Sequence, residues 1–301
     1  MSDEAMVSPA GAEDRGRGSV PARALTIAGS DCGGGAGIQG DLKTFQELGV
    51  FGMSVVTAVT AQNSLGVQRA DPVSPRLIAA QLESVLADLG ADAAKTGMMP
   101  TLDAAEVVAG ALRRFGVRRL VVDPVRQSKD GYALADRGAF EATARLLFPL
   151  AELATPNVPE AAALLGVREP ELALLGERVD AARSLLAWGS RYVLLKGGHA
   201  ADDACADILV SAADGGAEPL LLRGRRLPGA SARGTGCAFA AAACASMALG
   251  RDVPTACRDA KSFVAAALAA RLPLGAGTAS LKHAAWRDGR LPAEASISDG
   301  R

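Results

Sequence analysis

A short glycine-containing segment, Gly234, Thr235, Gly236 and Cys237, stands directly before a run of small apolar residues at 238–249. That run predicts a helix, and the amides of the preceding segment would be the free N–H groups at its start. Such amides bind phosphate through hydrogen bonds and the helix dipole, and glycines let the backbone approach the anion closely. The same field is expected to lower the pKa of the Cys237 thiol below about 8.5, so that it can polarise or deprotonate a substrate hydroxyl. The alternative is a glycine-rich helix start with a buried, inert cysteine.

Asn157, Glu160 and Lys196 are candidate groups for phosphates and their metal ion. Asn157 and Glu160 follow an expected strand and open an expected helix, where they can hold the waters of a Mg²⁺ ion. A helix N-cap with its capping-box partner is a structural reading compatible with that role. Lys196 ends another expected strand, where its ammonium group can meet phosphate or be solvated in a turn.

Gln62, Met98 and Asp41 are candidates for recognising an organic substrate. Gln62 comes just after an apolar strand and offers both a donor and an acceptor, which match the ring nitrogen and amino group of an aminopyrimidine. Met98 would supply an apolar wall. Asp41 lies one turn into an expected helix, where a carboxylate also simply complements the helix dipole.

Short apolar runs alternate with longer amphipathic segments along the chain, which predicts the elements that position these residues. The expected strands cover 24–28, 53–59, 91–96, 119–123, 150–155 and 192–195, and the expected helices lie near 38–48, 75–89, 102–115, 137–147, 179–188, 235–249 and 254–270. A weaker pair, 207–210 and 220–222, predicts a hairpin at one edge of the sheet. Strand–helix–strand repetition implies an α/β fold with parallel strands and helices on both faces. The candidate residues follow the strands, so we expect them to meet at the carboxyl edge of the sheet, where ligands bind in such folds.

Composition and charge exclude several classes of protein. The chain has 301 residues, a formal net charge of −1 and no long basic run, which argues against nucleic acid or an anionic membrane as partner. No stretch is apolar enough to span a bilayer. The G-x-G-x-x-G match at 35–40 does not directly follow a strand, as a dinucleotide site requires, and the next expected strand does not end in an acidic residue. No P-loop motif occurs.

The same data give expectations about domains and location. Residues 1–22 are rich in Gly, Ser, Pro and charge and are expected to form a disordered tail, with a single domain over 23–301. The five cysteines are odd in number and contain no CxxC pair, so neither a disulfide frame nor a zinc site is favoured. Free cysteines suit a cytoplasmic location.

Taken in order, these segments resemble the hydroxymethylpyrimidine (phosphate) kinases of the ribokinase superfamily over about residues 24 to 270. The segments that carry the resemblance are 24–31, 34–45, 57–58 with 61–63, 95–98, 123–125, 155–160, 196–199 and 234–237. Ordered agreement over so many loops is more specific than any single motif.

The resemblance implies a three-layer α/β/α sandwich with a mainly parallel central sheet. It also implies ATP with Mg²⁺ as phosphoryl donor, a small-molecule pyrimidine substrate and a homodimer. The implied substrate contacts are Gly29, Asp41 and Gln62, flanked by Met98 and Val125. The implied phosphate contacts are Asn157, Glu160 (reaching the metal ion through water), Lys196 and Thr235, with Gly234, Gly236 and Cys237 at the transferring phosphoryl group.

Three departures from the family pattern concern the substrate. Arg126 stands where Met is usual, Arg233 stands where His is usual, and a Gly-His-Gly-x-Pro-like stretch is replaced at 275–283. Two added arginines near a phosphate site could favour an already phosphorylated substrate. Two alternatives therefore stay open beside the pyrimidine kinase: a pyridoxine/pyridoxal kinase, and a catalytically degenerate relative that binds a pyrimidine as a sensor.

Overall fold

The computed structural model describes residues 20–135, 137–198, 205–213, 217–224, 227, 229–287 and 298–300. The tail expected at residues 1–22 lies outside the described residues up to residue 19, as do His199 and the two glycines of the expected hairpin, Gly215 and Gly216.

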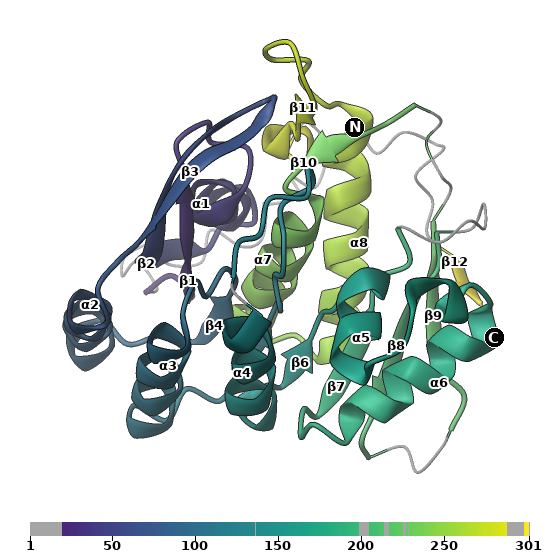
Figure 1. Cartoon of the computed structure of the whole chain (residues 1–301), viewed down its shortest axis with the longest axis horizontal. Helices are drawn as coiled ribbons and strands as arrows, with labels where there is room; N and C mark the ends of the chain where they lie inside the picture. Colours follow the sequence, from purple (N-terminus) through teal and green to yellow (C-terminus); the bar gives the residue numbers. More distant parts are fainter. Residues whose placement is uncertain are drawn as a thin grey trace, which may run out of the picture.

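Ten strands make one sheet through the middle of the molecule (Figure 1). They are β1 (Arg23–Asp31), β2 (Phe51–Asn63), β3 (Gly66–Pro72), β4 (Ala93–Thr96), β5 (Leu120–Val122), β6 (Leu153–Ala154), β7 (Tyr192–Leu195), β8 (Asp207–Ser211), β9 (Leu220–Arg223) and β12 (Ser298–Gly300). Their order is β12-β9-β8-β7-β6-β5-β4-β1-β2-β3. The neighbours from β7 to β2 are parallel, whereas β3 at one end and β8, β9 and β12 at the other are antiparallel. The predicted mainly parallel sheet is confirmed.

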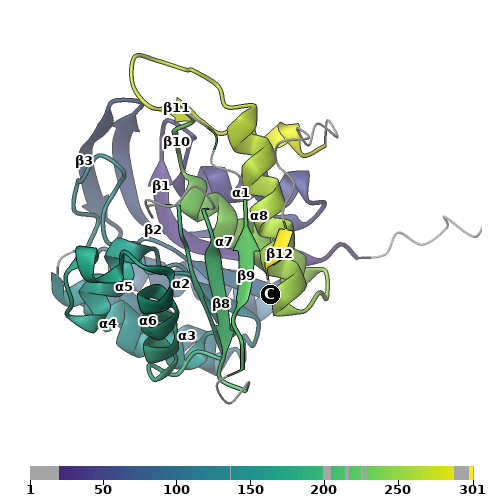
Figure 2. The ribbon, with the colours of Figure 1, turned by 90° about the vertical axis from the view of Figure 1, so that its right-hand side faces the viewer.

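Helices cover both faces of this sheet and complete three layers (Figure 2). They are α1 (Gly37–Glu47), α2 (Pro75–Asp88), α3 (Leu102–Arg114), α4 (Arg137–Leu147), α5 (Val158–Leu165), α6 (Leu175–Leu186), α7 (Thr235–Ala248) and α8 (Val253–Ala269), with 3₁₀ turns at Phe148–Leu150, Glu169–Leu172 and His283–Ala285. One face carries α2 to α6 over a core of larger aliphatic residues, and the other carries α1, α7 and α8. The expected α/β/α sandwich is therefore confirmed.

Helix α7 is buried on nearly all sides because its residues are small. Every residue from Ala238 to Met247 is buried, and most are alanine. A helix that is apolar all round belongs in a core, and its short side chains let it lie close to the sheet and to α8. This packing fixes the start of α7 at the carboxyl edge of the sheet.

Several elements differ from the sequence prediction. Strand β3 was not predicted because it is a polar edge strand, which forms by continuing the hairpin ladder from β2 and not by apolar alternation. The predicted hairpin is present as β8 and β9, but β12 lies outside it at the edge of the sheet. Helix α6 begins at Leu175, four residues before the predicted start, with Glu177 bonded back to the amide of Leu174.

The chain reverses direction across the sheet at β1. From β1 it continues to β2 on one side, and it later returns to β4 on the other. Such a switch point opens a crevice at the carboxyl ends of the two strands. The short parallel pair β10 (Ala232–Arg233) and β11 (Ala279–Ser280) lies above this crevice (Figure 1).

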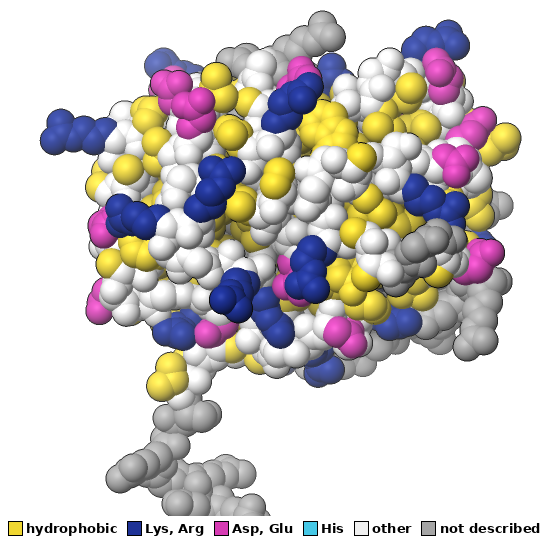
Figure 3. Space-filling model, turned by 90° about the horizontal axis from the view of Figure 1, so that it is seen from below, with side chains coloured by type: hydrophobic (Ala, Val, Ile, Leu, Met, Phe, Trp, Pro, Cys, Tyr) yellow, Lys and Arg dark blue, Asp and Glu magenta, His cyan; other side chains and the backbone are white. Residues whose placement is uncertain are grey.

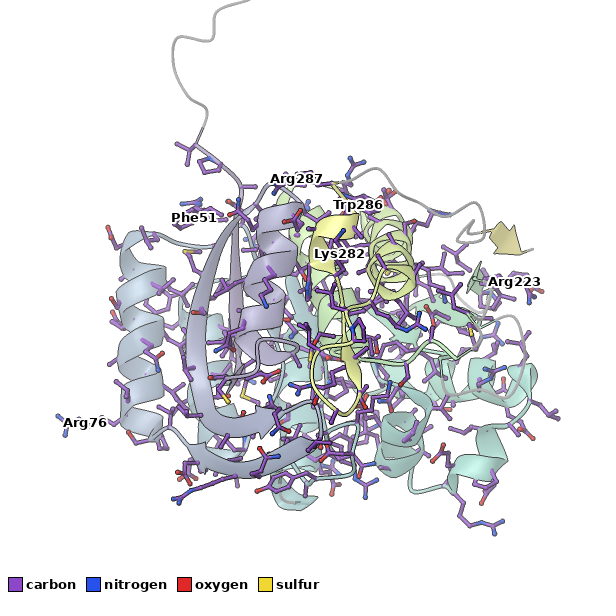
Figure 4. The ribbon with its side chains drawn as sticks, turned by 90° about the horizontal axis from the view of Figure 1, so that it is seen from above. Phe51, Arg76, Arg223, Lys282, Trp286 and Arg287 are labelled. Atoms are coloured by element: carbon purple, nitrogen blue, oxygen red, sulfur yellow. The ribbon has the colours of Figure 1, made fainter. Side chains whose placement is uncertain are left out.

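The segment after α8 returns across α1 and α8 (Figure 4). The ring of Trp286 packs on that of Phe263 with centroids 5.8 Å apart, and Arg287 pairs with Glu47 of α1 at 3.2 Å. In the described part of the chain no helix combines the length and the apolar character needed to cross a bilayer.

Candidate active site

A cavity of about 670 Å³ opens at the carboxyl ends of the parallel strands. The strand-following segments predicted to meet there do so. Of the residues singled out in the sequence, all but Asp41 line the cavity: Gly29, Gln62, Met98, Val125, Asn157, Glu160, Lys196, Gly234, Thr235, Gly236 and Cys237. Cavities of this size accommodate small organic ligands.

Two helices, α1 and α7, begin at the cavity wall. Gly37 and Thr235 are their first residues, and both line the cavity. In neither helix does the side chain of the N-cap residue bond the first amides. Both starts place the positive end of a helix dipole at the cavity, which favours an anion there, although the amide of Gly37 is already bonded to Cys237.

Gly234 sets the close approach of these two helix starts. It is the N-cap of α7 and has a φ of 78°, in the left-handed region that favours glycine. A Cβ at this position would lie 2.1 Å from the carbonyl oxygen of Gly35. The start of α7 therefore packs directly on the glycine-rich loop before α1, and no larger residue fits.

Lys196 and Asp123 form an ion pair beside the start of α7. The Nζ of Lys196 lies 2.7 Å from Oδ1 of Asp123, which also accepts a hydrogen bond of 3.1 Å from Thr155. A Cβ on Gly236 would lie 3.3 Å from the same Nζ, so the ammonium group adjoins the α7 amides. Burial lowers the pKa of Lys196, but the Asp123 carboxylate and then that of Glu160 outweigh it and raise the pKa, which keeps the lysine charged.

Asn157 and Glu160 form a complete capping box at the start of α5. The amide of Glu160 donates to Oδ1 of Asn157, and the amide of Asn157 donates to Oε2 of Glu160, both at 2.8 Å. The structural reading of this pair is therefore present. Burial raises the pKa of Glu160 to about 7, with Lys196 opposing the shift and Asp123 adding to it. Both side chains also line the cavity, so the functional reading remains compatible.

Gln62, Met98 and Gly29 also line the cavity, and Gly29 lies against Met98. A Cβ on Gly29 would lie 2.7 Å from the sulfur of Met98, and the Met98 carbonyl accepts from Thr57 at 2.6 Å. The side-chain amide of Gln62 makes no hydrogen bond to another residue that the structure describes. It is therefore free to bond a ligand with both its donor and its acceptor.

The expectation that Asp41 contacts the substrate is corrected by its position. Asp41 is fully buried and is absent from the cavity wall. Its Oδ2 accepts from Nζ of Lys95 and from the hydroxyl of Thr26, each at 2.7 Å. Burial lowers the pKa of Lys95, but the Asp41 carboxylate outweighs it and raises that pKa. Asp41 thus holds a charged lysine, which itself lines the cavity.

The expected low pKa of Cys237 is also corrected. The thiol lies at the third position of α7 and accepts a hydrogen bond from the amide of Gly37. Burial nevertheless raises its pKa to about 11, although the Lys95 ammonium opposes the shift. Loss of hydration outweighs the field of the helix start, so Cys237 is a neutral thiol near pH 7.

The two unusual arginines occupy different environments. Arg126 is exposed and lines the cavity. Arg233 also lines the cavity, and its guanidinium bonds the Asp31 carboxylate and the carbonyl of Asn63. Its contact with a substrate phosphate stays a prediction. The segment that replaces the usual C-terminal stretch packs on the β2–β3 turn, where the amide of Thr278 donates to Ser64 at 2.8 Å.

A sequence model of the phosphomethylpyrimidine kinase family matches residues 31–282. The chain belongs to this family. It is 46% identical over 264 residues to a hydroxymethylpyrimidine/phosphomethylpyrimidine kinase of Streptomyces coelicolor, covering 88% of this chain and 95% of the relative.

Solved structures of related kinases share the fold. A pyridoxal kinase of Bacillus subtilis in complex with ADP is similar with a TM-score of 0.81 and 36% identity, covering 89% of this chain and 99% of that one. A phosphomethylpyrimidine kinase from Clostridium difficile gives a TM-score of 0.70 and 35% identity, covering 80% and 97%.

Within the phosphomethylpyrimidine kinase family motifs, sequence reasoning gave no role to two charged residues, Lys95 and Asp123. Lys95 lies within β4 and Asp123 directly follows β5; both line the cavity, and each is paired with a charge of opposite sign. The available signal was a charged residue within or next to an otherwise apolar strand. Such a group is buried only when it is paired, so it predicts an ion pair at that place.

Proposed function

We propose that the chain transfers the γ-phosphoryl group of ATP to 4-amino-5-hydroxymethyl-2-methylpyrimidine, to its monophosphate, or to both, in thiamine biosynthesis. The observation that carries this proposal is that one cavity combines two kinds of group. The starts of α1 and α7 and the Lys196 ammonium line it, and so do Gln62 and Met98. Anion-binding groups beside a hydrogen-bonding amide and an apolar side chain suit phosphoryl transfer to a flat heterocycle.

The chain's own groups supply positioning and charge stabilisation, which are the main needs of phosphoryl transfer. Gln62 orients the ring, and the amides from Thr235 to Cys237 meet the negative charge of the transferring group. The substrate oxygen forms the new bond to the γ-phosphorus while the bond to the ADP oxygen breaks, and the proton of a substrate hydroxyl passes to water. Lys196 holds charge on the phosphate side throughout.

Glu160, Asp123 and Asn157 offer the oxygen donors that would serve Mg²⁺. Carboxylate and amide oxygens are the ligands that Mg²⁺ accepts in proteins, usually with several waters retained. Glu160 and Asp123 are buried side chains on the cavity wall, and this donor set fits an ion held partly through water. The ion supplies neutralisation of phosphate charge when bound.

We expect substitution of Cys237 to have a modest effect. With its pKa raised to about 11, the thiol stays protonated from pH 6 to 9 and acts as a hydrogen-bonding group. Cys237→Ala should lower kcat about tenfold or less, since a neutral hydrogen bond contributes about 0.5–1.5 kcal/mol. Cys237→Ser should retain more activity, and the shape of its pH–rate profile should match wild type. Losses of about 1,000-fold in both variants would instead make the thiol the base.

We expect MgATP binding to release protons near pH 7 because Glu160 must lose its proton to serve the metal ion. Titration calorimetry in buffers of different ionisation enthalpy should find release that decreases as pH rises through 7 and is absent at pH 9. Glu160→Gln should remove it, whereas Glu106→Gln, on the exposed face of α3, should not. Equal release in wild type and Glu160→Gln would contradict the assignment.

The same group predicts a pH dependence of stability. Its ordinary pKa of 4.5 is raised to about 7, so between these values the folded chain holds a proton that the unfolded chain has lost. The free energy of unfolding should therefore fall as pH rises from 4.5 to 7. Glu160→Gln should remove that part of the slope in urea unfolding.

The decisive test of the proposed function is turnover of the two pyrimidines. Purified protein is incubated with MgATP and either hydroxymethylpyrimidine or its monophosphate, and both ADP and phosphorylated product are measured. ATP binding and cooperative unfolding are checked on the same sample. A folded protein that binds ATP and phosphorylates neither pyrimidine would refute the proposal.

Pyridoxal is a second candidate substrate because pyridoxal kinases are among the similar structures. It also carries a hydroxymethyl group on a flat ring, and it would reach the same cavity. Side-by-side measurement of kcat/KM for pyridoxal and both pyrimidines decides between them. A higher value for pyridoxal would reverse the order of the two candidates.

We further propose that residues 23–301 form one domain, that the protein is cytoplasmic and that it forms a homodimer. Val59 and Leu65 of the β2–β3 hairpin are exposed apolar residues that a second copy could cover. Sedimentation velocity tests the dimer. Both signs of charge are mixed on the face opposite the cavity (Figure 3), which favours neither nucleic acid nor membrane as partner.

A further inference from the structure

Arg233 connects three parts of the cavity wall that are far apart in the sequence. It lies on β10, directly before Gly234, and its side chain is only 12% exposed. One guanidinium nitrogen bonds the carboxylate of Asp31, at the end of β1, and another bonds the carbonyl of Asn63, at the end of β2. The arginine thus joins the start of α7 to the ends of two neighbouring strands.

Asp31 determines the shape of the glycine-rich loop before α1. Its side chain is fully buried, and its two oxygens accept the amides of Gly33 at 2.8 Å, Gly35 at 3.0 Å and Ala36 at 2.8 Å. Arg233 supplies the balancing charge for this carboxylate. The loop that Asp31 holds leads into α1, whose first residue, Gly37, lines the cavity.

Asn63 directly follows Gln62, the candidate ring-binding residue. Because Arg233 bonds the backbone carbonyl of Asn63, it restrains the end of β2 and with it the position of Gln62. The loop after β5 also reaches this point, since Lys129 donates to the carbonyl of Ala232 at 3.0 Å. The end of β2, which carries Gln62, and the start of α7 are therefore tied through one side chain.

We propose that Arg233 is a positioning residue that sets the distance between the ring held at Gln62 and the amides that follow Gly234. This inference rests on the proposed function and gives a cavity-wall residue a role through its bonds to Asp31 and Asn63. A guanidinium can bond two acceptors in a fixed plane, whereas the ammonium group of lysine is a point charge without that geometry. Phosphoryl transfer depends on alignment, and a displacement of about 1 Å can lower the rate about 100-fold.

The test compares Arg233→Met, Arg233→Lys and Arg233→His with wild type. We expect Arg233→Met to lower kcat for the pyrimidine about 100-fold, while KM for ATP changes less than about threefold. The kcat of Arg233→Lys should lie between those of wild type and Arg233→Met, because lysine keeps the charge opposite Asp31 and loses the bond to Asn63. Arg233→His, the residue usual in the family, should retain more activity than Arg233→Met.

Arg119→Met is the matched control. Like Arg233, Arg119 bonds two acceptors, in its case the backbone carbonyls of Met247 and Arg251, but it is not on the cavity wall. The substitution Arg119→Met should lower the midpoint temperature of thermal unfolding without changing kcat per folded molecule. Arg233→Met combined with Asp31→Asn should lose less activity than the product of the two single effects, because both act on one contact.

The outcomes separate the positioning role from the proposed function. Active wild type with an unchanged kcat in Arg233→Met would refute the positioning role alone. A selective rise in KM for the monophosphate, with kcat unchanged, would make Arg233 a substrate-phosphate ligand and also refute it. Wild type that phosphorylates neither pyrimidine would refute the proposed function, and the positioning role with it.

Discussion

Gly234→Ala is expected to lower kcat/KM for the pyrimidine about 1,000-fold, since it displaces several amide donors and loss of one such donor costs about 100- to 1,000-fold. Gly234 has a φ of 78°, and a Cβ there would lie 2.1 Å from the Gly35 carbonyl oxygen. The alanine must push the start of α7 away from the loop before α1. The amides that face the phosphoryl group then move with it. Steady-state kinetics on folded protein measures the effect.

Gly116→Ala is the control variant, because it introduces backbone strain without displacing a neighbouring segment. Gly116 has a φ of 65°, similar to that of Gly234, but nothing lies within 4 Å of a Cβ built there. Left-handed conformation in a non-glycine residue costs roughly 1–2 kcal/mol, so this variant should lose stability and keep its kcat. Retention of more than a tenth of wild-type activity by Gly234→Ala would show that the α7 start does not position the reacting group.

The sequence predicted the sheet well because its central strands are short apolar runs bounded by polar loops. Strands of a parallel sheet are buried on both faces, so their sequences show the pattern directly. The cavity residues were found for the same reason, since they follow those strands. Strand β3 was missed because its stability comes from pairing with β2. The pattern of apolar residues within a single segment does not show such pairing.

The sequence failed where long-range packing decides the state of a polar group. Asp41 is buried and is paired with Lys95, which lies 54 residues away in the sequence. Its position on a helix could therefore not reveal that it lies behind the cavity wall. Arg233 is bonded to residues 170 and 202 positions away. The pKa of Cys237 was predicted from the helix dipole, which local sequence shows, whereas burial, which it does not show, has the larger effect.

Lys196→Met is expected to lower kcat/KM about 1,000-fold and also to destabilise the fold. The lysine side chain is 12% exposed and its partner Asp123 is 2% exposed. Removing one partner of a buried ion pair leaves an unpaired charge, which costs about 3–5 kcal/mol. The loss of activity has a separate cause, because the ammonium group beside Gly236 no longer offsets phosphate charge.

The double variant Lys196→Met with Asp123→Asn separates these two causes. Neutralising Asp123 removes the unpaired buried charge, so urea unfolding should recover most of the lost stability. Turnover should stay low, because no cation has returned beside the start of α7 and because Asp123→Asn also weakens the donor set for Mg²⁺. If activity recovered together with stability, Lys196 would be a structural counter-ion for Asp123, and the charge that stabilises the transferring phosphoryl group would have to come from the helix starts and Lys95 instead.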